Sequence, residues 1–73
     1  MNLGQLLDTV EYGTRVRLVH YKSTYNSDEY ITTFVMSDTL EYTKAYELVE
    51  PHIEKEVIIV YVTADGKLCV EIL

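Results

Sequence analysis

Apolar residues concentrate in the last third of the chain, in two runs separated by a turn. Val57–Val62 is an unbroken apolar run rich in β-branched side chains, which favour pleated strands. Asp65-Gly66 follows, a pair typical of a tight type I′ turn because both residue types tolerate a positive φ. Residues 68–72 then alternate between apolar and polar positions, as in a strand with one buried face. The pattern predicts a β-hairpin.

The first arm of this hairpin, Val57–Val62, is apolar on both of its faces. That predicts a central strand covered on both sides. Either a helix and a loop of the same chain cover it, or a partner molecule buries one face. Two short helices would cover little more than one face of a four-stranded sheet. We therefore expect a symmetric homodimer, the alternative being that segments around Tyr12 and residues 42–46 fold over the second face.

The N-terminal residues 2–10 have the spacing of a short amphipathic helix. Asn2 is a suitable N-cap, and Gly13 lies just beyond the expected end. The shared apolar face consists of Leu3, Leu6, Leu7 and Val10. A helix this short is marginal alone, so we expect it to be held by packing on the sheet.

Two further strands follow the helix. Residues 14–22 and 29–36 are rich in β-branched and aromatic types, and the polar stretch 23–28 between them is typical of a loop. The two segments predict a second hairpin, with a loop longer than two residues.

A second helix is expected before the last hairpin. Asp38 and Glu41 have capping-box spacing, although the periodic positions also allow a start nearer Thr43, and Pro51 marks the end. The element order is then α-β-β-α-β-β. It predicts one α+β domain over residues 1–73, with a four-stranded, mainly antiparallel sheet and two short helices. Which strands are neighbours between the two hairpins stays open.

The charge balance indicates which kinds of partner the protein can bind, and the cysteine content indicates its cellular compartment. Twelve acidic residues against six basic ones leave a net charge of −6, which argues against direct binding to nucleic acid or to anionic membranes. The acidity favours solubility or a basic protein partner. The single cysteine forms no internal disulfide, and the chain starts without a signal-peptide pattern and has no run long enough to span a membrane. We expect a cytoplasmic protein.

Catalytic constellations are not evident in the sequence. Cys69 could be a nucleophile only beside a base, and its place in a strand favours a packed cysteine. His52 with Glu50 and Glu54 could hold a metal, but the spacing matches no known ligand pattern, and a solvated linker is favoured. We expect no enzyme activity, no cofactor and no metal.

Tyrosine is unusually frequent, with seven residues against one phenylalanine and no tryptophan. So many tyrosines cannot all be buried in a small domain, and tyrosine is enriched at interfaces. The alternative is that each ring lies on the surface with its hydroxyl in water. The candidate interaction surface comprises Tyr21, Phe34, Ile58, Val60, Tyr42 and Tyr46.

The chain resembles small acidic proteins of unassigned function encoded by phages, prophages and other mobile elements of Gram-positive bacteria. The resemblance is carried by residues 6–7, 13–18, 54–57 and 65–72. The resemblance implies a bacterial cytoplasm, or the host cytoplasm for a phage protein, and an accessory role. We therefore expect a non-enzymatic protein that self-associates or binds a host or phage protein. The alternative is an acidic mimic of nucleic acid that inhibits a DNA-handling or defence enzyme, through a spaced array of Glu41, Glu47, Glu50, Glu54 and Glu56.

Overall fold

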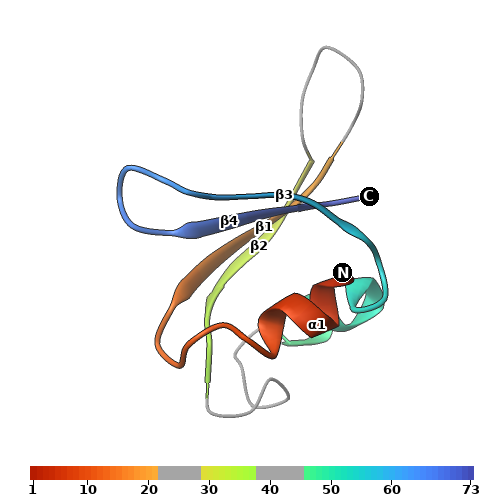
Figure 1. Ribbon diagram of the computed structural model, residues 1–73, viewed down its shortest axis with the longest axis horizontal. Coiled ribbons are helices and arrows are strands. Elements are labelled where there is room, and N and C mark those ends of the chain that lie inside the picture. The colour runs from red at the N-terminus through yellow and green to blue at the C-terminus, as the bar shows by residue number, and fades with distance from the viewer. Residues whose placement is uncertain (22–28, 38–45) are drawn as a thin grey trace.

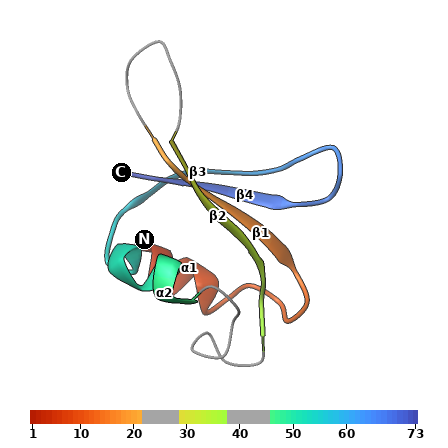
Figure 2. The same ribbon diagram turned by 180° about the vertical axis from the view of Figure 1, so that it is seen from behind.

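A four-stranded sheet with two short helices on one face forms the fold (Figure 1). The computed structural model describes residues 1–21, 29–37 and 46–73. Its elements are α1 (Leu3–Leu7), β1 (Arg15–His20), β2 (Glu29–Val35), α2 (Tyr46–Val49), the 3₁₀ helix η2 (Glu50–His52), β3 (Val57–Val62) and β4 (Leu68–Ile72). The predicted α+β class and the order α-β-β-α-β-β are confirmed. Seen from behind, α1 and α2 lie on the same side of the sheet (Figure 2).

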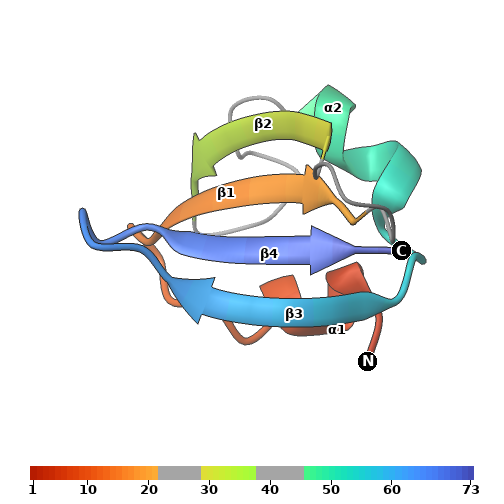
Figure 3. The same cartoon turned by 90° about the horizontal axis from the view of Figure 1, so that it is seen from above.

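The strand order is β2-β1-β4-β3, which answers the question of neighbours that the sequence leaves open. The outer pairs, β1 with β2 and β3 with β4, are the two predicted antiparallel hairpins. Between them β1 and β4 run parallel, with Leu18 opposite Val70. The last strand of the chain therefore lies inside the sheet (Figure 3). The predicted loop at 23–28 lies outside the described residues.

The prediction of a central position for β3 is wrong, because β3 is an edge strand. Its partner β4 uses its second side to pair with β1, and this pairing leaves β3 with one neighbour. An apolar run on both faces fits an interior strand and an uncovered edge strand equally well. Long-range pairing decides between them.

The helix α1 begins as predicted and ends earlier. Asn2 is the N-cap, and its side chain and that of Gln5 form a reciprocal capping box at 2.8 Å in each direction. The helix stops at Leu7 and not at residue 10, because the next amides bond three residues back, Thr9 N–H to the carbonyl of Leu6 at 2.9 Å. Gly13 therefore lies in the connection to β1, well after the helix end.

The second helix ends just before Pro51, as the sequence predicts. α2 ends at Val49, and the chain continues through Pro51 in the 3₁₀ helix η2. Proline is accepted there because it occupies the first turn, where its missing N–H has no partner to lose. Both predicted starts, near Asp38 and near Thr43, lie outside the described residues.

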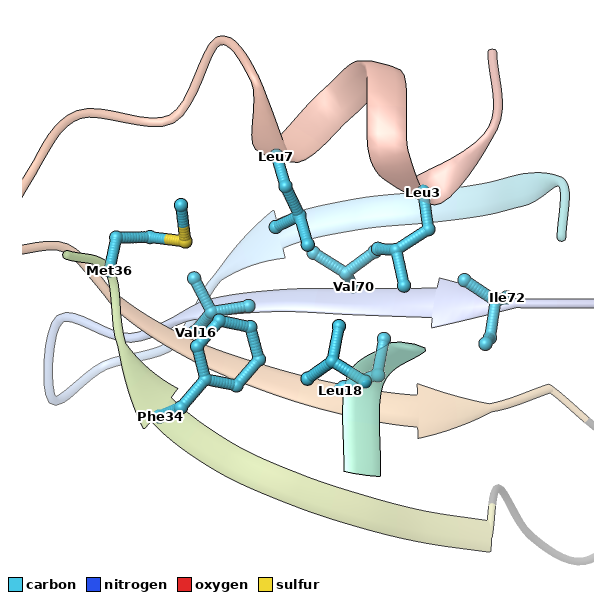
Figure 4. Close-up of a cluster of buried hydrophobic side chains, with 9 residues drawn as sticks. Leu3, Leu7, Val16, Leu18, Phe34, Met36, Val70 and Ile72 are labelled. Atoms are coloured by element: carbon cyan, nitrogen blue, oxygen red, sulfur yellow. The ribbon is translucent and has the colours of Figure 1, made fainter. Parts of the chain in front are cut away.

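The core lies between the sheet and the helices (Figure 4). Buried side chains come from both helices and from three strands, and the cluster consists of Leu3, Leu7, Val16, Leu18, Phe34, Met36, Val49, Val70 and Ile72. The predicted helix face is confirmed, since Leu3 and Leu7 are buried while Leu6 and Val10 pack against the cluster in part. Phe34 belongs to this core, so its assignment to an accessible interaction surface is wrong.

The turn of the second hairpin contains Asp65-Gly66 as predicted but is not type I′. Gly66 N–H bonds to the carbonyl of Thr63 at 3.0 Å, and Thr63 N–H bonds to that of Lys67 at 2.8 Å. The loop thus has three residues, with Gly66 in the left-handed region at φ 86° as the bulge residue. Asp65 accepts a hydrogen bond from the Thr63 hydroxyl and lies 3.2 Å from the Lys67 ammonium. These contacts lower the pKa of the Asp65 carboxyl, the Thr63 hydrogen bond being the largest cause.

We expect Gly66→Val to lower the free energy of unfolding by about 1–3 kcal/mol, because a β-branched residue is strained at positive φ. Steric conflict is not the cause, since the nearest atom to an added Cβ is Nη2 of Arg15 at 3.5 Å. Urea denaturation measures the effect, and Gly66→Asn, which tolerates the left-handed region, is the control. Equal midpoints for the valine variant and the parent would contradict this turn geometry.

Candidate interaction surface at the sheet edge

Strand β3 lies at one edge of the sheet (Figure 3). Its apolar side chains are exposed. The exposed fractions are 40% for Ile58, 39% for Ile59, 43% for Val60, 43% for Tyr61 and 69% for Val62. The strand contains no charged residue and no proline. Natural edge strands usually carry lysine, proline or a bulge that discourages pairing with other chains. β3 has one such device, a bulge between Val57 and Ile59, at its start.

Backbone groups of Val60 and Val62 point away from the sheet. In an antiparallel ladder, residues alternate between those that bond their partner and those whose N–H and C=O face outward. Thr63 bonds Lys67 at the turn. The alternation continues from Thr63 back along β3. The N–H and C=O groups of Tyr61 and Ile59 therefore face β4, while those of Val60 and Val62 face the open edge.

The N-terminal segment covers the beginning of β3. Val57 N–H bonds to the carbonyl of Met1 at 3.0 Å, Leu3 N–H bonds to that of Lys55 at 2.9 Å, and Asn2 forms an antiparallel bridge with Glu56. The open edge therefore extends from Ile58 to Val62, and we call these five residues the β3 edge.

The other edge strand, β2, has a different composition. It contains Glu29 and the threonines Thr32 and Thr33, and its exposed apolar residues are Tyr30 and Val35. Edges that include charged and polar residues pair less readily with other chains. The two edges therefore provide a matched comparison within one chain.

The sheet face opposite the helices carries Arg17, Cys69 and two tyrosines. The Arg17 guanidinium lies 5.3 Å from the ring centroid of Tyr30, and its Nη1 lies 3.5 Å from the Cys69 sulfur. The pKa of the Tyr61 phenol is raised, mainly by a hydrogen bond with Cys69. Cys69 is fully buried, as the packed-cysteine interpretation expects, so a substrate has no access to its sulfur.

His52 lies in η2 and is partly buried. Its Nδ1 is buried without a hydrogen-bond partner among the residues that the structure describes. Burial, followed by the charge of Lys55, lowers the pKa of this imidazole. Across residues 1–21, 29–37 and 46–73, no group of three potential ligands is close enough to hold a metal ion, and this includes the candidate set of His52, Glu50 and Glu54.

The structure separates the residues of the candidate interaction surface. Ile58 and Val60 are exposed on the β3 edge, whereas Tyr21 and Tyr46 are half-buried elsewhere. Tyr42 lies outside the described residues. Sequence reasoning missed Val62, the most exposed side chain of β3, because the hairpin was expected to place this strand inside the sheet.

The acidic residues of the array expected for a nucleic-acid mimic are exposed where they are described: Glu47, Glu50, Glu54 and Glu56. Lys55 interrupts this set between its last two members. Glu41 and Lys44 lie outside the described residues.

Comparisons with models of protein families, with curated proteins and with solved structures find no significant match. Among the helices in the described parts of the chain, none has the length and apolar character needed to cross a membrane.

Proposed function

We propose that this chain is a non-enzymatic interaction protein that binds another protein chain through the β3 edge. The main support for this proposal is that the β3 edge consists of five consecutive exposed, uncharged residues on a strand with outward-facing backbone groups. An extended segment can add to such an edge as a further strand, with main-chain hydrogen bonds for affinity and side chains for specificity.

The accessory role follows from the same proposal. A phage or mobile-element protein acting in the bacterial cytoplasm would bind a host or phage protein, or a second copy of itself, and alter what that protein does. The complete burial of Cys69 supports a function without catalysis by this thiol. The net charge of −6 supports a protein partner over nucleic acid.

Capture of a partner from a Gram-positive bacterial lysate tests the proposal. We expect the immobilised parent to retain a specific protein, and Val62→Lys to lose it, because a lysine on an edge strand opposes pairing. Val35→Lys on β2 is the matched control, since it also replaces an exposed edge valine. Equal capture by both variants would contradict binding through β3. Failure of the parent to bind any protein or itself would overturn the proposed function.

A further inference from the structure

We infer that the partner of the β3 edge is a second copy of this chain, paired antiparallel about a two-fold axis so that one sheet runs through both copies. This inference rests on the proposed function and specifies its partner. A two-fold axis makes an interface self-complementary, because the same residues lie on both sides. The β3 edge meets this requirement in its backbone and its side chains, and the strand carries no charge that would oppose the pairing.

The outward-facing backbone groups define the register. With the axis at Tyr61, Val60 of each copy lies opposite Val62 of the other, and every outward N–H and C=O of these valines has a partner. An axis at Val60 would instead require Ile58, which lies in the bulge between Val57 and Ile59. Only the Tyr61 axis uses the regular part of the strand alone.

Side chains on both faces of the extended sheet would then lose exposure. Val60 and Val62 lie opposite Val70 and Leu68, on the face that carries the core. On the other face, Tyr61 would meet Tyr61 of the second copy as a directly opposed aromatic pair, which is favourable in antiparallel strands. The side chains concerned are those that β3 leaves 39–69% exposed.

The paired part of the strand carries no charge. No charge lies within Val57–Val62, so the residues around the axis bring no like charges together. Like charges directly opposite each other would destabilise an antiparallel pair. In this register Lys55 falls level with Lys67 of the second copy, but that position lies outside the open edge, where Met1–Leu3 already run along residues 55–57.

Proline substitution removes the outward N–H of an edge strand without breaking the bonds to its neighbour. Val60→Pro does this at the proposed interface. Val35→Pro is the matched control on β2: Met36 N–H bonds to Thr14 at 2.9 Å, so Val35, one residue before, also points its N–H outward. Both positions are exposed valines on edge strands. Circular dichroism of each variant establishes that the fold is retained.

Sedimentation over a wide range of concentrations provides the first measurement. We expect the parent and Val35→Pro to rise from 8.5 kDa to twice this mass. Val60→Pro should dissociate at least about tenfold more readily, since each substitution occurs in both copies. Amide hydrogen exchange provides the second. The amides of Val60 and Val62 should become protected as the dimer forms, while that of Val35 stays unprotected.

The outcomes separate this inference from the proposed function. A parent that stays at 8.5 kDa with unprotected Val60 and Val62 amides overturns the self-pairing, as does a dimer that Val60→Pro leaves intact. If the monomeric parent still captures a different protein in a β3-dependent manner, only the identity of the partner is wrong. When neither self-association nor capture depends on β3, both proposals fail.

Discussion

Leu7→Ala is expected to lower the free energy of unfolding by about 2–5 kcal/mol, the range for a fully buried leucine. Leu7 is 1% exposed and lies between α1 and the sheet in the main cluster (Figure 4). The loss combines the transfer free energy of the deleted atoms with the cavity that remains. Because a domain of this size has only about 3–5 kcal/mol of stability, a large part of the population should unfold.

Urea denaturation followed by circular dichroism measures this change, and Leu48→Ala is the matched control. Leu48 is also a helical leucine, in α2, but 54% of it is exposed, so its truncation should change stability by no more than about 0.5 kcal/mol. If both variants unfold at the midpoint of the parent, α1 does not dock on the sheet as described.

Ile72→Ala should also cost about 2–5 kcal/mol. Ile72 is fully buried and belongs to β4, with His20 of β1 on one side and Val57 of β3 on the other. Truncating it leaves a cavity beside the two strands that β4 joins. Thermal or urea unfolding measures the loss.

The neighbouring residue provides a sharp control for Ile72. Leu73 is 62% exposed, so Leu73→Ala should change stability by about 0.5 kcal/mol or less. A slip of one residue in the register of β4 would move every side chain to the opposite face and exchange the roles of the two positions. A larger loss for Leu73→Ala than for Ile72→Ala would therefore contradict the pairing of β4 with β1.

Local features of this fold were predictable from sequence because they depend on residues close together in the chain. The capping of α1 by Asn2, the strands and the position of the Asp65-Gly66 turn all follow from spacing over a few residues. The turn type was missed because Asp-Gly suits both a two-residue loop and a three-residue loop that ends in glycine.

Strand order was not predictable, because it depends on a parallel pairing between distant segments. This pairing moves β4 to the interior and β3 to the edge. The same long-range pairing determines which residues of the candidate interaction surface are exposed. Phe34 faces the core because it pairs with Val16 in the buried layer, whereas Ile58 and Val60 stay exposed because β3 is at the edge of the sheet formed by the described residues. Apolar character alone does not distinguish these cases.

The interior position of β4 has a consequence for how the protein emerges from the ribosome. Synthesis delivers β1, β2 and β3 before the strand that joins them, and Arg17 contacts Cys69, which lies 52 positions later in the sequence. Until residues 68–72 are available, the first hairpin and β3 have no common neighbour, and the buried face of α1 lacks Val70 and Ile72 of the core cluster. Parallel pairing over such a separation forms slowly compared with local hairpins. Folding of the sheet is therefore completed only when β4 is available, and β3 stays an unpaired apolar segment until then.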